Sequence, residues 1–404
     1  MTLNDKKVKE LFPILSGNIV YLDSAATAQK PKCVLDAITD FYLHKNANPM
    51  RGLYDLSITA TDDYELSRKA CARFIGAADA CEIIFTRNAT ESLNLAADCI
   101  GATLTPDDEI LVATSEHHSN FLPWKKACER SGASIRFLDC MPDGIMTPEM
   151  LKAALTPKTK LFSVAQISNV FGRINPVEEY AKICHENGTL ICIDASQSVP
   201  HIAVDVRKID ADFLAFSGHK LYGPMGIGML YGKKKLLKKL PPFLRGGEMI
   251  DYVSKERIIF ADLPHKYEAG TVSAADAAGL RAAIEFVEGI GFDEIEKREL
   301  HLTELAMEGM KKIPHVRLLG GYTPGEHNGI LTFTIDDVHP HDIAAMFAAE
   351  NVCIRAGHHC AQPLHLLLGI PSTVRASIAF YNTDEDIEKF LSVLATIRSQ
   401  MGYE

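Results

Sequence analysis

The stretch RAGHHCAQPL, residues 355–364, places Cys360 directly after two histidines near the end of the chain. A cysteine in this setting can act as a thiolate nucleophile, as a metal ligand or as a packed loop residue. A nucleophile must be ionised, and only a few per cent of an ordinary thiol, with a pKa of about 8.5, is thiolate near neutrality. Positive charge on His358, His359 or Arg355 would raise that fraction. The loop alone does not distinguish the three roles.

A second set of polar residues follows two apolar strands. LICID ends in Asp194, Gln197 follows in ASQS, and FLAF runs into Ser217-Gly218-His219-Lys220. Ligands of open α/β sheets bind beyond the carboxyl ends of the strands, so these side chains should meet at one edge. A buried carboxylate can hold a pyridine nitrogen protonated, a lysine can form a Schiff base, and polar residues beside it could hold a phosphate. Separately, Asp194 is more simply a helix cap and Lys220 a solvated lysine; together they favour a cofactor site.

Two further segments reach the same edge of the sheet. Thr86-Arg87-Asn88-Ala89-Thr90-Glu91 leads from a strand into a helix, where backbone N–H groups and the Thr90 hydroxyl could hold an anion. Glu116-His117-His118-Ser119-Asn120 follows another strand, and one of its histidines could stack on a flat cofactor ring. Alone, the first segment is more simply a helix start, and the second a capping or metal-binding loop.

The elements that must position these residues alternate between strands and helices. Short β-branched runs predict buried strands, and the amphipathic stretches between them have helical length and period. The predicted strands are 19–22, 83–85, 110–113, 161–164, 190–193 and 213–216, and the predicted helices are 91–100, 120–131 and 176–187. This alternation predicts an α/β fold with a mostly parallel sheet covered on both faces.

From about residue 272 the pattern changes. A long helical region runs to about 313 with a break at 291–293, and shorter elements follow it. They are strand-like 315–319 and 329–335, helical 341–350, strand-like 373–378 and a last helix at 384–399. This part predicts a smaller α+β domain. We expect a large domain over 16–290 and a small domain made of 1–15 and 291–404.

Composition excludes several classes of protein. The net charge of -10, without a long basic stripe, argues against a nucleic-acid-binding protein. No apolar run approaches the roughly 18 residues of a membrane span, and the N-terminus lacks the apolar core of a signal peptide. The ten cysteines are scattered without a C-x-x-C pair, which is typical of a reduced, cytoplasmic enzyme rather than a disulfide scaffold.

Seven segments occur in the order seen in class-V-like pyridoxal-phosphate enzymes. They are YLDSAATAQKP, TRNATESLNLAA, SEHHSNFLPW, ICIDASQSVPH, FSGHKLYGPMGIG, YEAGT and RAGHHCAQPL. From about residue 19 to the C-terminus the chain resembles cysteine desulfurases of the SufS type. DASQS alone is only moderately specific, whereas the ordered set is highly specific. The resemblance implies the type I pyridoxal-phosphate transferase fold and pyridoxal 5'-phosphate as the cofactor.

The resemblance also implies roles for cofactor-binding residues. Lys220 corresponds to the Schiff-base lysine, Asp194 to the partner of the pyridine nitrogen and His117 to the residue that stacks on the ring. The remaining correspondences are Gln197 for the ring hydroxyl, Thr90, Ser217 and His219 for the phosphate, Ala89 in the phosphate loop where threonine is common, and Thr271 for a phosphate contact from the other subunit.

On the substrate side, Arg375 corresponds to the arginine that binds the substrate carboxylate, and Asn169 and Arg355 lie at substrate-contacting positions. Cys360 corresponds to the nucleophile that receives sulfur, so the resemblance favours the reactive thiol. A metal site in this loop is disfavoured because no second cysteine lies nearby in sequence. Pro363 stiffens the short segment that follows Cys360, so we expect a held thiol rather than a mobile arm.

The activity implied is conversion of L-cysteine to L-alanine, with sulfur passing to a persulfide on Cys360. A SufE- or SufU-like acceptor would then take the sulfur for iron-sulfur cluster assembly, and the resemblance implies a homodimer with shared active sites. Selenocysteine lyase remains an alternative, and so does a class-V aminotransferase, although the latter needs no nucleophilic cysteine. A non-enzymatic binding protein is disfavoured because Lys220, Asp194, His117 and Arg375 are all present.

One segment departs from the family pattern. A His-Arg-Gly-x-His stretch is common in the family, whereas this chain reads Met50-Arg51-Gly52-Leu53-Tyr54. Both histidines are absent, which leaves any role they have in substrate handling or dimer contact without a counterpart here.

Overall fold

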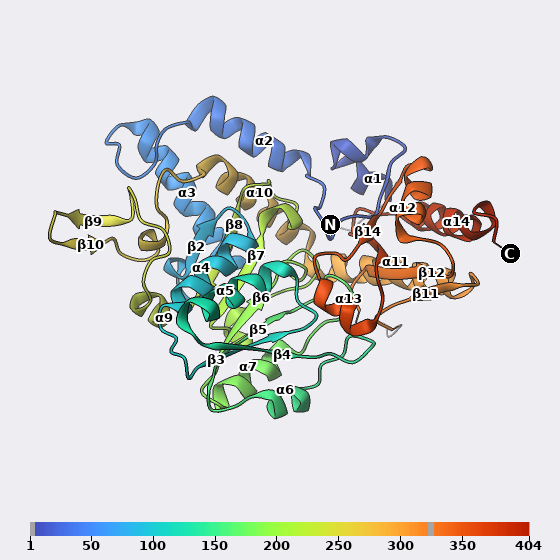
Figure 1. Ribbon diagram of the computed structural model, residues 1–404. Helices are drawn as coiled ribbons and strands as arrows, with labels where there is room; N and C mark the ends of the chain where they lie inside the picture. The colour runs from blue at the N-terminus through green and yellow to red at the C-terminus, as the bar shows by residue number, and fades with distance from the viewer. Residues whose placement is uncertain (1–4, 322–326, 404) are drawn as a thin grey trace.

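The computed structural model describes residues 5–321 and 327–403 (Figure 1). Its central element is a seven-stranded sheet with the order β2-β8-β7-β6-β5-β3-β4. β8 pairs antiparallel with both neighbours, and the other pairings are parallel. The strands are β2 (Ile83–Thr86), β3 (Glu109–Ala113), β4 (Ser134–Leu138), β5 (Thr159–Ala165), β6 (Leu190–Asp194), β7 (Phe213–Ser217) and β8 (Gly228–Gly232). The expected α/β fold with a mostly parallel sheet is confirmed.

Helices cover both faces of this sheet. Successive side chains of a strand point to opposite faces, so Ile83 and Ile84 enter different cores. The core of Ile84 contains side chains of α4 (Ala89–Gly101), α5 (Leu122–Ser131) and α9 (Lys234–Lys239). The core of Ile83 contains side chains of α3 (Asp55–Phe74), α6 (Pro148–Ala154), α7 (Val177–Glu186), α8 (Val206–Ile209) and α10 (Ala274–Ile290). The helices predicted at 91–100, 120–131 and 176–187 are α4, α5 and α7.

The C-terminal part, orange to red in Figure 1, has its own antiparallel sheet with the order β11-β12-β15-β14. A separate core that includes Leu302, Phe333 and Phe390 packs beneath it. Its elements are α11 (Phe292–Lys311), β11 (Val316–Leu318), β12 (Ile330–Ile335), α12 (Pro340–Ala349), β14 (Arg355–Gly357), α13 (Gln362–Leu368), β15 (Thr373–Ser377) and α14 (Asp384–Gln400). The expected α+β character of this part is what the structure shows.

The strand expected at 19–22 exists but does not belong to the large sheet. β1 (Val20–Tyr21) pairs in parallel with β13 (Val352–Cys353), and Leu22 lies in the core of the C-terminal part. Its apolar pattern identifies a strand but carries no information about a partner that lies more than 300 residues away, which is why the sequence misplaced it.

Residues near the N-terminus pack across both parts of the molecule. The Phe12 ring lies 6.3 Å from that of Tyr222, 5.8 Å from that of Phe286 and 5.9 Å from that of Phe380, measured between centroids. The domain boundaries that we placed at residues 16 and 290 stay a prediction.

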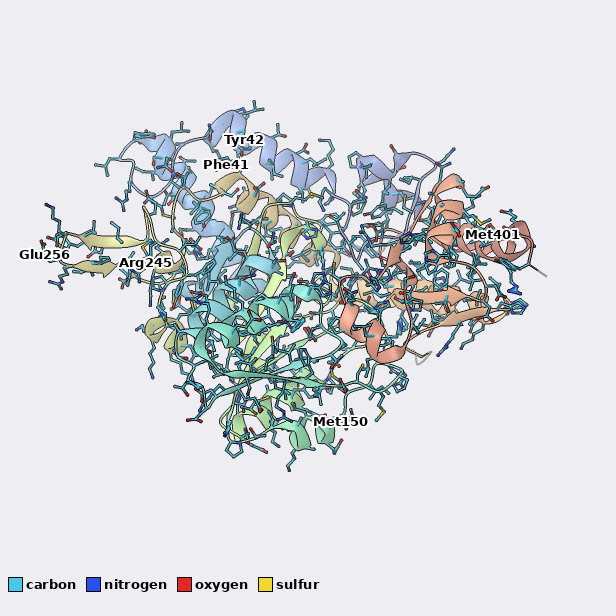
Figure 2. All side chains as sticks on the ribbon, in the orientation of Figure 1. Phe41, Tyr42, Met150, Arg245, Glu256 and Met401 are labelled. Atoms are coloured by element: carbon cyan, nitrogen blue, oxygen red, sulfur yellow. The ribbon has the colours of Figure 1, made fainter. Side chains whose placement is uncertain are left out.

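The N-terminal helices α1 (Asp5–Glu10) and α2 (Lys32–Asp40) lie along the upper edge of the view in Figure 1. On the side away from the C-terminal part, the hairpin of β9 (Ile250–Val253) and β10 (Ile258–Phe260) projects from the body. Figure 2 shows Arg245 near its base and Glu256 at its outer end. Among the helices of the described residues, none has the length and apolarity to cross a membrane.

Two strands of the large sheet carried too little signal to be predicted. β4 is an edge strand, and most positions of its sequence SIRFL are exposed or half-buried, so it lacks an apolar run. β8, GMLYG, is fully buried but begins and ends with glycine, which in a sequence is typical of a turn.

Candidate active site

A cavity of about 590 Å³ opens between the carboxyl ends of the large sheet's strands and the loop around Cys360. Such a volume suits a cofactor together with a small substrate. Its wall includes Ala89, Thr90, His117, Asn169, Asp194, Gln197, Ser217, His219, Lys220, Arg355, Cys360 and Arg375. The structure therefore brings together every site residue expected from the sequence except Thr271, which is exposed and lines other hollows of the surface.

Lys220 and Asp194 extend from neighbouring strands. Asp194 is the last residue of β6, and its carboxylate accepts a hydrogen bond from the Ser196 N–H at 2.9 Å. Lys220 ends the single 3-10 turn after β7, and no hydrogen bond or ion pair from residues 5–321 or 327–403 holds its ammonium. Burial lowers the pKa of Lys220, while Asp194 opposes that shift. A lysine held without a partner and with a lowered pKa can act as an amine nucleophile or base.

The other end of the cavity can bind an anion. The first turn of α4 faces it, and the Ala89 N–H donates to the Ser217 Oγ at 2.8 Å. The Thr90 hydroxyl is 2.7 Å from that of Ser119. Nδ1 of His219 is buried and has no partner among the described residues, and burial lowers the pKa of this ring to about 4. The start of a helix, neighbouring hydroxyls and an unpartnered histidine nitrogen together suit a phosphate.

Gly228 lets β8 approach this anion-binding turn. A Cβ at residue 228 would lie 2.6 Å from the Cα of Asn88, a distance at which backbone must move. Asn88 caps α4, because its side chain accepts a hydrogen bond from the Glu91 N–H at 2.9 Å. A glycine in β8 therefore fixes where α4 begins.

His117 and Gln197 complete the wall on the cofactor side. Nδ1 of His117 accepts a hydrogen bond from the Ser119 N–H at 3.1 Å, so this nitrogen carries no proton. Burial, with Lys220 second, lowers the pKa of His117 to about 3, so the ring is neutral near pH 7. The Gln197 amide donates to the carbonyl of Ala25 at 2.9 Å. A neutral, half-buried imidazole is a suitable surface for a flat ring.

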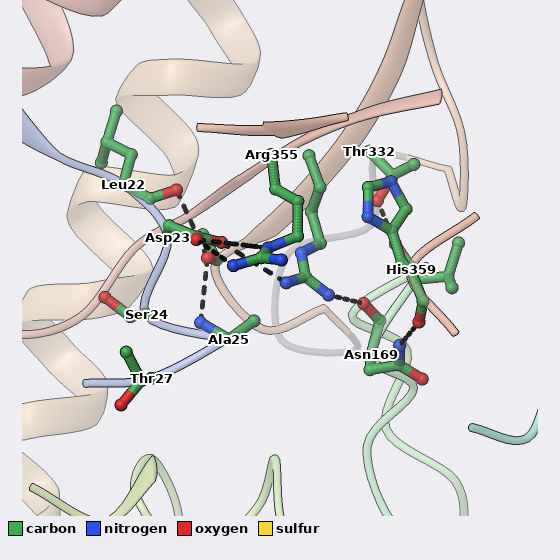
Figure 3. A network of polar contacts seen from close by, with 12 residues as sticks. Leu22, Asp23, Ser24, Ala25, Thr27, Asn169, Thr332, Arg355 and His359 are labelled. Carbon is green, nitrogen blue, oxygen red and sulfur yellow. Dashed lines mark hydrogen bonds and ion pairs between the residues drawn. The ribbon is translucent and has the colours of Figure 1, made fainter. Parts of the chain in front are cut away.

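Two arginines converge on one carboxylate at the substrate side. Asp23 accepts from Arg355 Nη2 at 2.9 Å, and its other oxygen lies 3.6 Å from Arg375 Nη2 (Figure 3). Arg375 also donates to the Asn169 carbonyl at 2.9 Å. Burial lowers the pKa of Arg375 to about 10, a value at which the guanidinium is still charged near neutrality. One buried and one exposed arginine with a single carboxylate between them retain positive charge for a substrate carboxylate.

The loop that carries Cys360 is pinned in a rare backbone conformation. His359 and Cys360 have φ of 50° and 57°, in the left-handed region that costs a non-glycine residue roughly 1–2 kcal/mol. The Cys360 carbonyl accepts from the His118 N–H at 2.7 Å, and the His359 carbonyl accepts from the Asn169 amide at 2.8 Å. The Cys360 side chain is exposed at the cavity. These contacts fit a held thiol.

The charges around Cys360 differ from those that the sequence suggested. Lys220, Arg355 and Arg375 each interact electrostatically with this thiol. His359 cannot contribute positive charge, because burial and the nearby Arg375 lower its pKa to about 2. The suggestion that a positive charge on His359 helps to ionise Cys360 is therefore wrong. Among the described residues, no group of three metal-ligating side chains lies close enough together to hold a metal ion.

Two acidic residues of the site were given no role from the sequence. Asp23 lies within YLDSAATAQKP and Glu116 within SEHHSNFLPW, both of which were noted only as motifs. Glu116 accepts hydrogen bonds from the Ala165 N–H at 2.9 Å and from the Asn120 amide at 2.6 Å. Burial raises the pKa of Glu116 to about 8. In each case the signal was a carboxylate within three residues of the end of an apolar run.

Comparison with known proteins agrees with this geometry. Residues 20–390 match the model of the family described as aminotransferase class-V. The chain belongs to that family. A "Probable cysteine desulfurase" of Halalkalibacterium halodurans is 44% identical over 407 residues, covering 99% of this chain and 100% of the relative. One of Staphylococcus epidermidis is 45% identical over 406 residues, covering 99% and 98%.

Solved structures of class-V aminotransferase relatives have the same fold. The apo cysteine desulfurase of Thermococcus onnurineus superimposes with a TM-score of 0.96 at 37% identity, covering 99% of both chains. The cysteine desulfurase CsdA of Escherichia coli, in an S-sulfonic acid form, gives a TM-score of 0.92 at 35% identity, covering 99% of this chain and 100% of that chain. The expected fold type and family resemblance are confirmed.

The class-V family assigns pyridoxal phosphate as the cofactor of this chain. The described residues fit the group. The start of α4 and the unpartnered Nδ1 of His219 suit its phosphate, Asp194 suits its ring nitrogen, and the unpartnered Lys220 suits its aldehyde.

Proposed function

We propose that this chain is a cysteine desulfurase that passes the sulfur of L-cysteine to Cys360 and releases L-alanine. The observation that carries the proposal is one cavity lined by Lys220, Arg375 and an exposed Cys360. The curated relatives of similar length bear the same activity in their names. An aminotransferase has no use for a thiol held in a strained loop, so the cavity favours desulfuration.

Bound pyridoxal phosphate supplies the electron sink that weakens the bonds at the substrate Cα. Arg375 would bind the substrate carboxylate through its guanidinium and so orient the side-chain sulfur toward Cys360. Asp194 would hold a proton at the ring nitrogen of the cofactor. Lys220 Nζ, with its lowered pKa, would take the Cα proton of the substrate as an amine. His117 would offer the ring a surface without charge, because its imidazole is neutral.

Cys360 then performs the sulfur transfer. Its thiolate forms an S–S bond to the substrate sulfur while the substrate C–S bond breaks, and the electron pair of that bond moves toward the substrate carbon. Protonation of that carbon yields alanine and leaves a persulfide on Cys360. Lys220, Arg355 and Arg375 are the cationic side chains that interact electrostatically with Cys360.

The test is to replace Cys360 with alanine. We expect Cys360→Ala to keep the cofactor absorption and to lose desulfuration by about a thousandfold or more, since the nucleophile is gone. Cys353→Ala is the matched control, a thiol seven residues earlier that is absent from the cavity wall. Mass spectrometry after addition of cysteine without reductant should find the extra sulfur on the peptide of Cys360. A persulfide on another cysteine, or full activity of the alanine variant, contradicts the proposal.

We further propose that the persulfide passes to a docking acceptor protein, in the context of iron-sulfur cluster assembly. A thiol held at the cavity mouth by His118 and Asn169 cannot travel far to deliver sulfur, so the acceptor must come to it. All ten cysteines carry free thiols, which fits a reducing compartment such as the cytoplasm.

We also propose a homodimer in which Thr271 reaches the partner's cavity. Thr271 is exposed and lines a surface hollow together with Phe41 and Tyr42, and it is absent from the wall of its own chain's active site. Figure 2 shows Phe41 and Tyr42 near the upper edge of the view. The nearby segment exposes Tyr42 by 61%, Leu43 by 70% and Leu53 by 95%. Large apolar side chains exposed in this number mark an interaction surface.

A further inference from the structure

Beneath the Cys360 loop, three buried side chains form a hydrogen-bonded row. The Thr373 hydroxyl lies 3.0 Å from His359 Nε2 and 3.0 Å from His365 Nε2. Nδ1 of His365 lies 3.0 Å from the carbonyl of Ala361, the residue that follows Cys360. Exposed fractions of 7%, 0% and 2% for His359, Thr373 and His365 keep the row from water.

The positions of the protons in this row follow from what each group can accept. A carbonyl only accepts, so His365 carries its proton on Nδ1 and offers Nε2 as an acceptor. The single hydroxyl proton of Thr373 is therefore donated to His365 at 3.0 Å, rather than to the more distant Gly357 carbonyl at 3.4 Å. Thr373 must then accept from His359, which carries its proton on Nε2. The row fixes one tautomer of a histidine next to the nucleophile.

The rest of His359 agrees with this assignment. Its Nδ1 is buried and has no partner among the described residues, as expected of a nitrogen that bears a lone pair. Burial disfavours a charged ring, and a proton there would also place a second positive charge close to Arg375, so the pKa of His359 is lowered to about 2. The ring is neutral and keeps one orientation throughout the working pH range.

Meanwhile, the backbone of His359 is held from the opposite side. The Asn169 amide donates to the His359 carbonyl at 2.8 Å, and the Asn169 carbonyl accepts from Arg375 Nη1 at 2.9 Å (Figure 3). Ring and carbonyl are thus both fixed at a residue whose φ is 50°. Two consecutive left-handed residues persist only where the surroundings over-determine them.

We infer that His359, with its tautomer set by Thr373 and His365, is a positioning residue that presents Cys360 to the substrate sulfur. His359 acts through the backbone of the loop rather than through charge. The His359 side chain fixes the loop through its hydrogen bond to the Thr373 hydroxyl. This inference rests on the proposed desulfuration and names residues that the reaction uses indirectly.

The test compares Thr373→Val with Thr373→Ser in the cofactor-loaded enzyme. Valine keeps the volume but leaves two histidine nitrogens without a partner, whereas serine keeps the hydroxyl. For Thr373→Val we expect the rate of the first alanine release to fall about 10- to 100-fold, because a displaced nucleophile loses alignment, with the cysteine KM unchanged. Thr373→Ser should restore the rate to near that of the wild type. Thr334→Val, on β12 of the same sheet and outside the cavity wall, is the control and should behave as wild type.

A second measurement does not depend on any variant folding. Nitrogen NMR of the wild type, with ¹⁵N in the histidine rings, should show His359 protonated on Nε2 only, with no titration between about pH 6 and about pH 9. An Nδ1–H tautomer, a titrating His359, or a Thr373→Val enzyme with wild-type first turnover overturns the inference. A serine variant as slow as the valine variant does so as well. If the wild type releases no alanine at all, the proposed function fails, while the tautomer measurement still tests the anchor.

Discussion

Two carboxyl groups near the cavity lie in different surroundings. Asp194 faces the cavity, whereas Glu116 is outside its wall, is 2% exposed and accepts from Asn120 and Ala165. Burial raises the pKa of Glu116 to about 8, so this carboxyl is protonated near neutrality. Of the two, only Asp194 lines the cavity, where a partner for the cofactor's ring nitrogen would have to lie.

The raised pKa of Glu116 predicts that the stability of the protein depends on pH. The pKa of Glu116 rises from 4.5 to about 8 on folding, so between these values the folded protein keeps a proton that the unfolded chain has lost. The contribution to unfolding free energy is fully present below pH 4.5 and is lost as pH rises toward 8, by up to about 1.4 kcal/mol per pH unit. In Glu116→Gln the free energy of unfolding should differ from that of the wild type by an amount that does not depend on the titration of residue 116. The loss of stability with rising pH that Glu116 causes should disappear. Denaturant unfolding at about pH 5, 6.5 and 8 measures it, and parallel curves for the two proteins would falsify the assignment.

For single residues, sequence motifs indicate which side chains belong to the site but not which residues they contact. Twelve of the thirteen expected site residues line one cavity, because strand ends and ordered motifs locate them. Asp23 had no assigned role because its partner Arg355 lies 332 residues further along the chain. The neutral state of His359 could not be predicted from the sequence either, since it follows from burial and from the nearby Arg375.

At the scale of elements, regular periodicity was predictable and short or glycine-flanked elements were not. α10 and α11 fill the long helical region, and they meet at Gly291, where the chain was expected to break. β14, which leads into the Cys360 loop, has only three residues and no alternation to detect. Such short strands form because adjacent strands in the sheet supply their hydrogen bonds. The local sequence does not show which strands will be adjacent.

The approach of β8 to α4 gives a prediction at this scale. Gly228→Ala should push the two backbones apart, because its Cβ would lie 2.6 Å from the Cα of Asn88. The anion-binding turn would then lose its geometry, and we expect cofactor affinity to fall about tenfold or more. Gly289→Ala is the control, since nothing lies within 4 Å of its added Cβ and alanine favours the interior of α10. Titration of the apoenzyme with pyridoxal phosphate measures both, and equal affinities would contradict this account of Gly228.

For the whole molecule, the single chain contains a nearly complete site and a residue that does not reach it. Thr271 is exposed, and so are large apolar side chains beside it. The two observations have one explanation if a second copy covers this surface, because a twofold interface would bring Thr271 to the partner's cavity and bury the apolar side chains. The segment 50–54, which lacks the family's histidines, is part of the same region.

A charge placed on this surface should separate the copies. We expect Leu43→Glu, which alters a side chain that is 70% exposed, to turn a dimer into a monomer with at least tenfold lower activity, because burial of an unpaired charge is costly. Met401→Glu changes a 40% exposed side chain near the C-terminus, far from Tyr42 in Figure 2, and should remain dimeric. Light scattering at the concentration of the activity assay measures the molar mass of each protein and so distinguishes monomer from dimer. A wild-type monomer with full activity refutes the dimer.

The pairing of β1 with β13 has a consequence for how the protein is made. Val20 pairs with Val352, so β1 leaves the ribosome well before its partner exists. At roughly 5–20 residues per second, the wait is on the order of 15–65 seconds. During that time the apolar side chains of Val20 and Leu22 have no core to enter, and nascent chains are open to chaperones and to mispairing. Arg355, the partner of Asp23, is synthesised after an equally long interval, and Cys360 is synthesised later still. A ribosome-bound chain can therefore fold its sheet before it has a reactive thiol, so the chemistry begins only on a nearly finished protein.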